Sequence, residues 1–180
     1  MKKFSKPDKS EYASFYSTYI DKLSDEFYDL NFLVNQSQEL IDIFSKLSDE
    51  QANFSYQEGK WSLKEVLGHL MDHERIFCYR ALAIARGEKK SLPGYEQDDY
   101  VKTAEFNKQK LSDLTEQYST NRSATISLFK NFTDEELHKI GMADNKNISV
   151  RALLFIIMGH EKHHIWIIKE RYLIKLRKIK

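Results

Sequence analysis

The sequence predicts an all-α protein built as a four-helix bundle. Apolar residues recur at intervals of three and four along almost the whole chain, while strand-like alternation is nearly absent. Only two prolines occur, and four of the six glycines lie between the expected long helices. With 180 residues, 41% of them hydrophobic, the chain suits one domain with a packed core. We expect a flexible terminus over residues 1–10 and a single domain over residues 11–180.

The first two long helices are marked by an apolar stripe and by a cap. A short helix is expected over residues 11–20, and a long amphipathic one follows over residues 28–47. The stripe of that long helix consists of Leu30, Leu33, Val34, Leu40, Ile41, Phe44 and Leu47. Ser62 and Glu65 have the spacing of a capping box, in which each side chain accepts a backbone N–H of the other residue. The second long helix therefore begins after Ser62, and it ends before Gly87, which suits a C-terminal cap.

The second half of the chain holds the other two long helices. Residues 88–103 are expected to form a long loop with one helical turn at 98–101, and long ordered loops are often functional. A third long helix covers residues 106–132, and a short capped turn follows it. The last long helix covers residues 150–173. Four long helices are typical of a four-helix bundle.

Charge and composition exclude several classes of function. The formal net charge is +1, from 28 basic and 27 acidic side chains, so no large electric field would attract nucleic acid. No stretch of about 18 apolar residues exists to span a membrane, and the first ten residues lack the apolar core of a signal peptide. One cysteine excludes an intrachain disulfide. We expect a cytoplasmic protein that binds neither nucleic acid nor membrane; a homodimer is compatible with the sequence.

Histidines on two expected helices form the main candidate site. His160 and His164 are four residues apart, so they lie about 40° apart on one helix face with Cβ atoms roughly 5–6 Å from each other. A third ligand must come from another helix, and His69 is the natural candidate. Neutral imidazole binds zinc, nickel, copper and iron. Three such ligands and one open position are typical of a catalytic metal site.

Neighbouring residues leave two questions open. Gly68 and Gly159 lie inside expected helices, where each costs about 1 kcal/mol relative to alanine. They either clear space beside the site or permit a close helix crossing. His73 pairs with His69 at the same four-residue spacing. If His73 completed a tetrahedron, the site would be structural; otherwise it lines a pocket or supports the ligands.

A zinc protease is an alternative to this three-histidine site, because the same segment contains a protease motif. The segment from His160 to His164 matches H-E-x-x-H, in which the glutamate is a general base. The extended motif needs a glycine and a third histidine, where this chain has Ile167 and Glu170. We therefore reject a protease and expect Glu161 to be exposed or at the boundary of the bundle.

Several separated motifs, in this order, carry a resemblance to a known family. They are Gly59-Lys60-Trp61-Ser62-Leu63-Lys64-Glu65, Gly68-His69-Leu70, Tyr79-Arg80-Ala81-Leu82-Ala83-Ile84-Ala85-Arg86-Gly87, Leu92-Pro93-Gly94-Tyr95 and Gly159-His160-Glu161-Lys162-His163-His164. In these the chain resembles the YfiT-like branch of the DinB superfamily from about residue 11 to residue 173. The resemblance implies a four-helix bundle with up-down-down-up topology and one divalent metal ion, zinc or nickel.

Carried over residue by residue, the resemblance assigns the metal ligands to His69, His160 and His164. The candidates for supporting or pocket residues are His73, His163, Arg80, Arg122 and Arg151. The three arginines either supply an anion pocket or form salt bridges between helices.

The resemblance also implies a class of chemistry. Similar proteins are S-transferases that use a low-molecular-weight thiol such as bacillithiol, so the expected partner is a small-molecule electrophile. The reacting group would then be a metal-bound thiolate, with no protein nucleophile. The alternatives are a metal-dependent hydrolase that activates water, and a non-catalytic metal-binding bundle of the stress response. Consumption of a thiol separates the first two, and a fourth protein ligand would favour the third.

Overall fold

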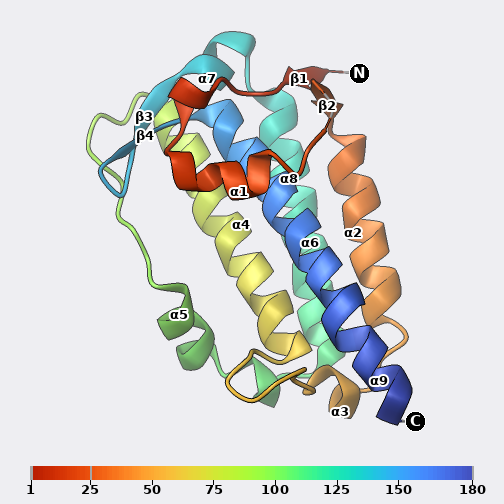
Figure 1. Cartoon of the computed structure of the whole chain (residues 1–180). Helices are drawn as coiled ribbons and strands as arrows, with labels where there is room; N and C mark the ends of the chain where they lie inside the picture. The colour runs from red at the N-terminus through yellow and green to blue at the C-terminus, as the bar shows by residue number, and fades with distance from the viewer. Residues whose placement is uncertain (1, 25, 180) are drawn as a thin grey trace.

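Four long helices form a bundle in which two run in each direction (Figure 1). The computed structural model describes residues 2–24 and 26–179. The long helices are α2 (Asn31–Phe44), α4 (Leu63–Ala85), α6 (Leu111–Asn131) and α8 (Val150–Ile167). Helices α2 and α8 run one way, and α4 and α6 run the other. The up-down-down-up bundle expected from the sequence is therefore confirmed.

The connection between α4 and α6 is long because these consecutive helices are parallel. It returns along the whole length of the bundle and contains α5 (Gln97–Ala104) and the 3₁₀ turn η3 (Phe106–Lys108). Helix α4 packs against both α6 and α8, and α2 packs against the same two helices. Within the described part of the chain, no helix has the length and apolar character needed to cross a membrane.

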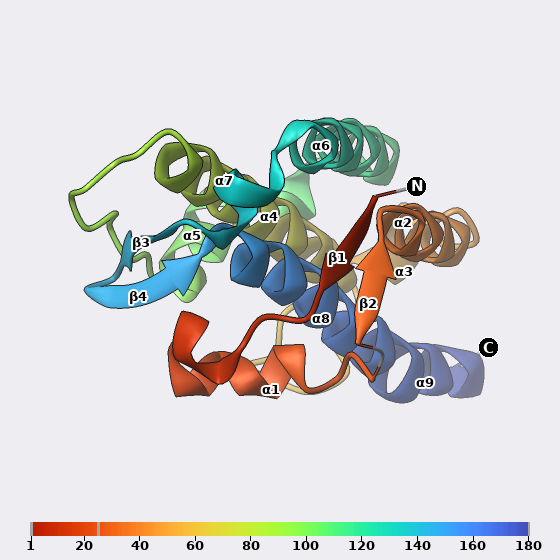
Figure 2. The same cartoon turned by 90° about the horizontal axis from the view of Figure 1, so that it is seen from above.

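The N-terminal segment covers one side of α8. It comprises β1 (Lys3–Ser5), the 3₁₀ turns η1 (Lys9–Glu11) and η2 (Ser14–Tyr16), α1 (Ser17–Ile20) and β2 (Phe27–Asp29). Strands β1 and β2 pair antiparallel, and α1 lies on the side of α8 away from α6 (Figure 2). Phe4 is 2% exposed. Phe4 and the strand pairing attach the described part of the segment expected to be flexible, residues 2–10, to the bundle, and Met1 lies outside the described residues.

A β-hairpin before α8 was not expected from the sequence. After the short helix α7 (Asp134–His138), strands β3 (Ile140–Ala143) and β4 (Lys146–Ser149) pair antiparallel. The two turn residues between them, Asp144 and Asn145, have φ of 50° and 56°. Asp and Asn tolerate this left-handed conformation, which two-residue hairpins require. The strands are only four residues long, so their periodicity is too short to recognise.

Several helix boundaries differ from the expected ones. Helix α2 begins three residues later than expected, because β2 occupies the preceding residues, and Val34 is 47% exposed instead of buried. The short helix α3 (Asp49–Ala52) follows α2. The expected turn at 98–101 is the eight-residue helix α5. After α8 the chain continues through a π-helical stretch, η4 (Ile168–Leu173), into α9 (Ile174–Ile179).

A buried polar layer separates two apolar clusters of the core. In α8, residues 150–158 belong to one cluster, and Ile165 belongs to the other. The other long helices divide in the same way. The buried polar residues at the division are Gln36 and Ser37 of α2, His73 and Glu74 of α4, Arg122 and Thr125 of α6, and His160 and Glu161 of α8. Polar groups buried in this way need partners inside the protein, and the candidate site lies in this layer.

Candidate metal centre and substrate cavity

Three imidazoles converge in the polar layer. His69 of α4 and His160 and His164 of α8 each offer a nitrogen, and these atoms all lie within 4.8 Å of one another. The Nε2 atoms of His69 and His160 are 3.0 Å apart. Two ligands of a tetrahedral zinc ion, each about 2.0–2.1 Å from the metal, lie about 3.4 Å apart. The separation of the His69 and His160 Nε2 atoms is therefore close to that of two nitrogens that share one divalent ion.

The protonation of these imidazoles also suits a metal. Burial lowers the pKa of His69 from 6.5 to about 4. Burial, together with the neighbouring imidazoles, lowers the pKa of His160 and His164 well below 6.5. The rings are thus neutral at pH 7, which is the form that binds metals. The Nδ1 atom of His164 is buried without a hydrogen-bond partner, as expected where a nitrogen is available to an ion. The donor set fits the divalent ion that the sequence predicts.

His73 lies beside this group but does not join it. Its ring stacks between the rings of Phe77 and His160, with centroids 3.9 and 3.8 Å away and interplanar angles of 19° and 17°. Because the lone pair of an imidazole nitrogen lies in the ring plane, two stacked rings cannot both aim at one ion. His73 therefore supports His160 by stacking. His163 is also outside the group, and its ring faces Tyr19 at 5.8 Å.

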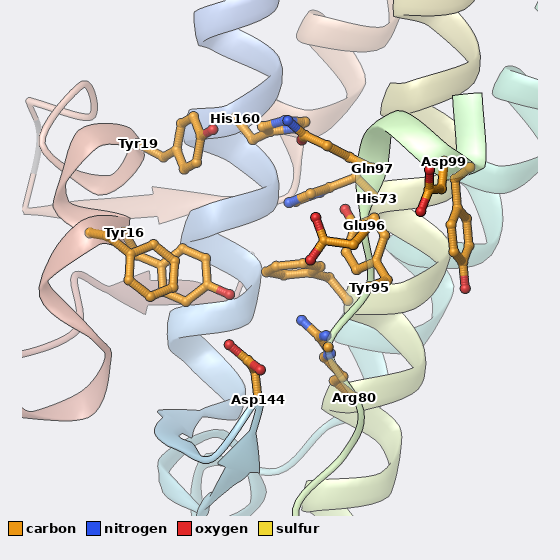
Figure 3. A pocket seen from close by; sticks show the side chains of 14 residues that line it. Tyr16, Tyr19, His73, Arg80, Tyr95, Glu96, Gln97, Asp99, Asp144 and His160 are labelled. Carbon is orange, nitrogen blue, oxygen red and sulfur yellow. The ribbon is translucent and has the colours of Figure 1, made fainter. Parts of the chain in front are cut away.

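A large cavity opens beside His160 and His73 (Figure 3). Its volume is about 650 Å³, which is within the range of small-molecule sites. Aromatic side chains and a few charged groups form its wall, from α1, α4, the 94–100 segment, the β3–β4 turn and α8. They are Phe15, Tyr16, Tyr19, Phe77, Arg80, Tyr95, Glu96, Gln97, Asp99, Tyr100 and Asp144. Arg80 and Tyr95 belong to motifs of the family resemblance, and residues 95–100 lie in the long loop that the sequence marks as a functional candidate. The residues from the N-terminal segment and the hairpin carry no sequence signal, because these segments meet the loop only in the folded chain.

Close backbone contacts hold the walls of the cavity in place. A Cβ at Gly159 would lie 2.2 Å from the carbonyl oxygen of Tyr19, so the glycine allows α1 to cross α8 beside His160. A Cβ at Gly68 would lie 2.3 Å from the ring of Phe106. Both glycines thus permit close packing, and Gly159 does so at the cavity wall. On the other wall, Leu92 forms a β-bridge to Ala143, which ties the loop to the hairpin.

A second, smaller cavity reaches the cluster at His164. Its volume is about 290 Å³. Trp61 lies in its wall and also packs against the His69 ring, with centroids 4.7 Å apart. Asp98, at the start of α5, lines this cavity, whereas Gln97 and Asp99 line the larger one. Two cavities with different linings therefore reach the cluster, one at His160 and the other at His164.

The three candidate arginines have different surroundings. Arg80 is 3% exposed and lines the large cavity, where it donates to the carbonyl of Pro93 over 2.7 Å. Arg122 lies in the core, where it forms ion pairs with Glu74 and Glu161. Arg151 forms an ion pair with Glu11 and so ties α8 to the N-terminal segment. Neither Arg122 nor Arg151 lines the large cavity; both form salt bridges between elements.

Glu161 corrects one expectation, and Cys78 is excluded as a nucleophile. Glu161 is 2% exposed, not exposed or at the boundary, because its carboxylate accepts hydrogen bonds from Arg122 and from the hydroxyl of Tyr118. Burial raises its pKa to about 7, against the opposing effect of Arg122. Burial also raises the pKa of the Cys78 thiol to about 12. That thiol is too weakly acidic to act as a nucleophile at neutral pH.

Comparisons with known proteins show relatives in sequence and in fold. A protein of Oceanobacillus iheyensis, whose name gives metal-dependent hydrolysis as its inferred activity, is 25% identical over 130 residues, covering 69% of this chain and 72% of its own. YfiT from Bacillus subtilis, described as a probable metal-dependent hydrolase with an unusual four-helix bundle topology, has a similar structure. Its TM-score is 0.72 at 18% identity, over 92% of this chain and 90% of that one.

A mycothiol-dependent maleylpyruvate isomerase shares the fold over part of its length. Its TM-score is 0.63 at 11% identity, over 80% of this chain and 59% of the isomerase. At such identities the likeness concerns the fold alone. The family model of the DinB superfamily matches residues 33–168, which include all three converging histidines. The chain therefore belongs to the DinB superfamily.

Proposed function

We propose that this protein is a divalent-metal-dependent enzyme that transfers a low-molecular-weight thiol of the bacillithiol type to small electrophiles. His69, His160 and His164 hold the ion, which is zinc or nickel. The observation that carries the proposal is the convergence of three neutral imidazoles beside a cavity of about 650 Å³. A divalent ion in such a position lowers the pKa of a thiol or water that occupies its open site.

The protein's own residues supply the setting for this reaction. The three imidazoles donate neutral nitrogens, and His73 holds the His160 ring by stacking. Because the Cys78 thiol is buried and weakly acidic, the reacting sulfur must belong to a co-substrate. A reducing compartment such as the cytoplasm keeps that co-substrate in its thiol form.

The second cavity favours transfer over hydrolysis. A transferase must bring two molecules to one centre, whereas a hydrolase needs room for one molecule and a water. The larger cavity reaches the cluster at His160 and the smaller one at His164, so a thiol and an electrophile can approach separately. A metal-dependent hydrolase is the second candidate, supported by what the named relatives are described to do. A structural metal site is disfavoured, because the stacked His73 leaves three converging ligands among the residues that the structure describes.

Thiol consumption and metal content together test the proposal. The purified protein, loaded with zinc or nickel, is mixed with bacillithiol and 1-chloro-2,4-dinitrobenzene; the expected reaction forms a carbon–sulfur bond and releases chloride and a proton. We expect about one ion per chain by elemental analysis and loss of free thiol above the uncatalysed rate. His160→Ala should lose both the ion and the activity. His163→Ala is the matched control and should keep them.

Two results would count against the assignment. Equal loss of metal from both histidine variants would exclude the three-histidine site. Turnover of an ester or amide by the metal-loaded protein, with no consumption of thiol in the assay above, would identify a hydrolase.

A further inference from the structure

Opposite charges line the end of the large cavity that is remote from the histidines. Arg80 and Asp144 both lie there, below His160 and His73 in Figure 3. Arg80 follows His73 by seven residues on α4, which places it about 10 Å farther along the helix axis. A molecule of that length can therefore touch the charged end and the histidine cluster together.

Arg80 is a buried cation whose hydrogen bonds are incomplete. Its Nη2 atom donates to the carbonyl of Pro93, but its Nε atom is buried without a partner. The guanidinium lies 5.0 Å from the centre of the Phe77 ring and 5.8 Å from that of Tyr95. Aromatic faces attract a cation but accept no full hydrogen bond from its N–H groups. The hydroxyl of Tyr16 also interacts with this guanidinium. A carboxylate from a ligand in the cavity would give the guanidinium a further, charged acceptor, in the geometry that it favours.

Asp144 is a fixed anion at the same end. It occupies the hairpin turn with φ of 50°. Its side chain packs against Gly94, where an added Cβ would lie 2.9 Å from the Oδ1 atom of Asp144. A hydrogen bond from Lys146 and that residue's charge hold the pKa of Asp144 below its usual value, so the carboxylate is ionised. The pair with Lys146 is solvent-exposed and contributes little energy. Asp144 therefore remains available to a ligand.

The two charges do not neutralise each other directly. In the described part of the chain, no ion pair within 4.0 Å joins Arg80 to Asp144. A lone carboxylate bound at Arg80 would be repelled by Asp144, and a lone ammonium at Asp144 would be repelled by Arg80. A ligand that carries a carboxylate and an ammonium group on the same carbon atom satisfies both residues at once.

We propose that this end of the cavity binds an amino-acid group, with its carboxylate on Arg80 and its ammonium on Asp144. The remainder of the molecule then extends along the aromatic wall toward His160. The inference rests on the proposed function only in taking this cavity as the substrate site. It adds the class of molecule that binds there: an amino acid or a conjugate that carries a free amino-acid group.

Three compounds that differ only in this group test the proposal. L-phenylalanine has both charges, 3-phenylpropionate lacks the ammonium, and L-phenylalaninamide lacks the carboxylate. We expect calorimetric titration of the purified protein to give L-phenylalanine an affinity about tenfold higher than that of either analogue, as for one charged hydrogen bond. Equal affinity for the three compounds, or no binding of L-phenylalanine, would overturn the proposal.

Variants assign the two charges separately. Asp144→Asn should abolish the preference for L-phenylalanine over 3-phenylpropionate, and asparagine tolerates the positive φ at this position. Arg80→Gln should abolish the preference over L-phenylalaninamide, while Arg80→Lys should retain part of it. Arg75→Gln, on the exposed side of the same helix, is the control and should change neither preference. If Arg80→Gln changes the binding preferences no more than Arg75→Gln does, Arg80 does not bind the ligand carboxylate.

The readout is independent of the metal and of turnover. Thermal unfolding shows whether Arg80→Gln is folded, and if it is not, Arg80→Lys and Asp144→Asn decide the question. Binding of L-phenylalanine with the expected preferences, in a protein that consumes no thiol, would support the amino-acid site and contradict only the proposed transfer reaction. Thiol consumption without any of these preferences would support the proposed transfer reaction and contradict the amino-acid site.

Discussion

Arg122 compensates the carboxylates that are buried in the polar layer. It is 2% exposed and forms ion pairs with two carboxylates, those of Glu74 and Glu161. Its Nη1 atom also donates to the carbonyl of Leu33. Three charges in the core would each be costly alone, because the protein interior solvates them poorly. Arg122 thereby connects α2, α4, α6 and α8 at the level of the histidines.

Removing this arginine should destabilise the fold severely. Arg122→Met leaves two buried carboxylates without their cation, and breaking a buried pair costs about 3–5 kcal/mol. Urea unfolding followed by circular dichroism would measure the loss. Lys130→Met, at an exposed position of the same helix, is the control and should change stability by about 0.5 kcal/mol or less. A similar, small loss in both variants would show that the buried network contributes nothing specific.

At the scale of the elements, the crossing of α1 over α8 depends on one glycine. Gly159 lies inside α8, where alanine would ordinarily stabilise the helix by about 1 kcal/mol. The added Cβ would instead meet the backbone of Tyr19, which cannot rotate away as a side chain can. The crossing also places Tyr19 in the cavity wall, with its ring 5.0 Å from that of His160.

We therefore expect Gly159→Ala to destabilise the protein despite the better helix propensity. Overpacking of this kind costs about 1–3 kcal/mol. Thermal unfolding would measure the change, and Ser123→Ala, at an exposed position inside α6, is the control for helix propensity. An increase in the melting temperature of Gly159→Ala would show that α1 does not pack closely on α8.

The ion pair of Glu11 with Arg151 joins the N-terminal segment to α8, and its contribution to stability should depend on pH. Burial alone would raise the pKa of Glu11, but hydrogen bonds from Arg151 and Ser149 outweigh it and hold the pKa below 4.5. Because the folded state binds this proton less readily than the unfolded state, the carboxylate stabilises the fold above about pH 4.5. That contribution is lost as the pH falls through the lower, folded-state pKa.

Glu11→Gln should thus lower the free energy of unfolding by about 1–3 kcal/mol near neutral pH, and by progressively less as the pH falls. Urea unfolding of both proteins between about pH 7 and pH 3 would measure the difference. The exposed Glu116→Gln serves as the control, with little change at any pH. A difference between wild type and Glu11→Gln that stays constant over this range would contradict the assignment.

At the scale of the whole molecule, the proposed ion would join two helices that are distant in sequence. His69 lies on α4, whereas His160 and His164 lie on α8. Residues 152–161 of α8 are buried, and the helix is surrounded by α1, α2 and α4 (Figure 2). An ion bound only by the folded state stabilises it by mass action.

Chelation should therefore lower the stability of the whole bundle. At a free metal concentration about 100 times the Kd the stabilisation is about 2.7 kcal/mol, which for a chain of this size is a shift of about 5–10 °C. Scanning calorimetry with and without EDTA would detect it. In His160→Ala the chelator should have no effect. A melting temperature that chelation leaves unchanged in the wild type would mean that the histidines hold no ion.

Features that depend on residues close together in the chain could be predicted from the sequence. The start of α4 follows from the capping box at Ser62 and Glu65, which the structure contains. The parallel arrangement of α4 and α6 was implied by the family resemblance, and the long connection agrees with it. The four-residue spacing of His160 and His164 ensures that they share a helix face, because that spacing is close to one helical turn.

Contacts between distant segments required the three-dimensional structure. Which histidine of α4 meets His160 and His164 depends on how deeply and at what rotation α4 and α8 pack, and this favours His69 over His73 one turn away. The burial of Glu161, the separate roles of the three arginines and the position of Asp144 in the cavity depend on the same packing. Helical periodicity predicts which residues face inward. The residues that they contact depend on side-chain packing across the whole core.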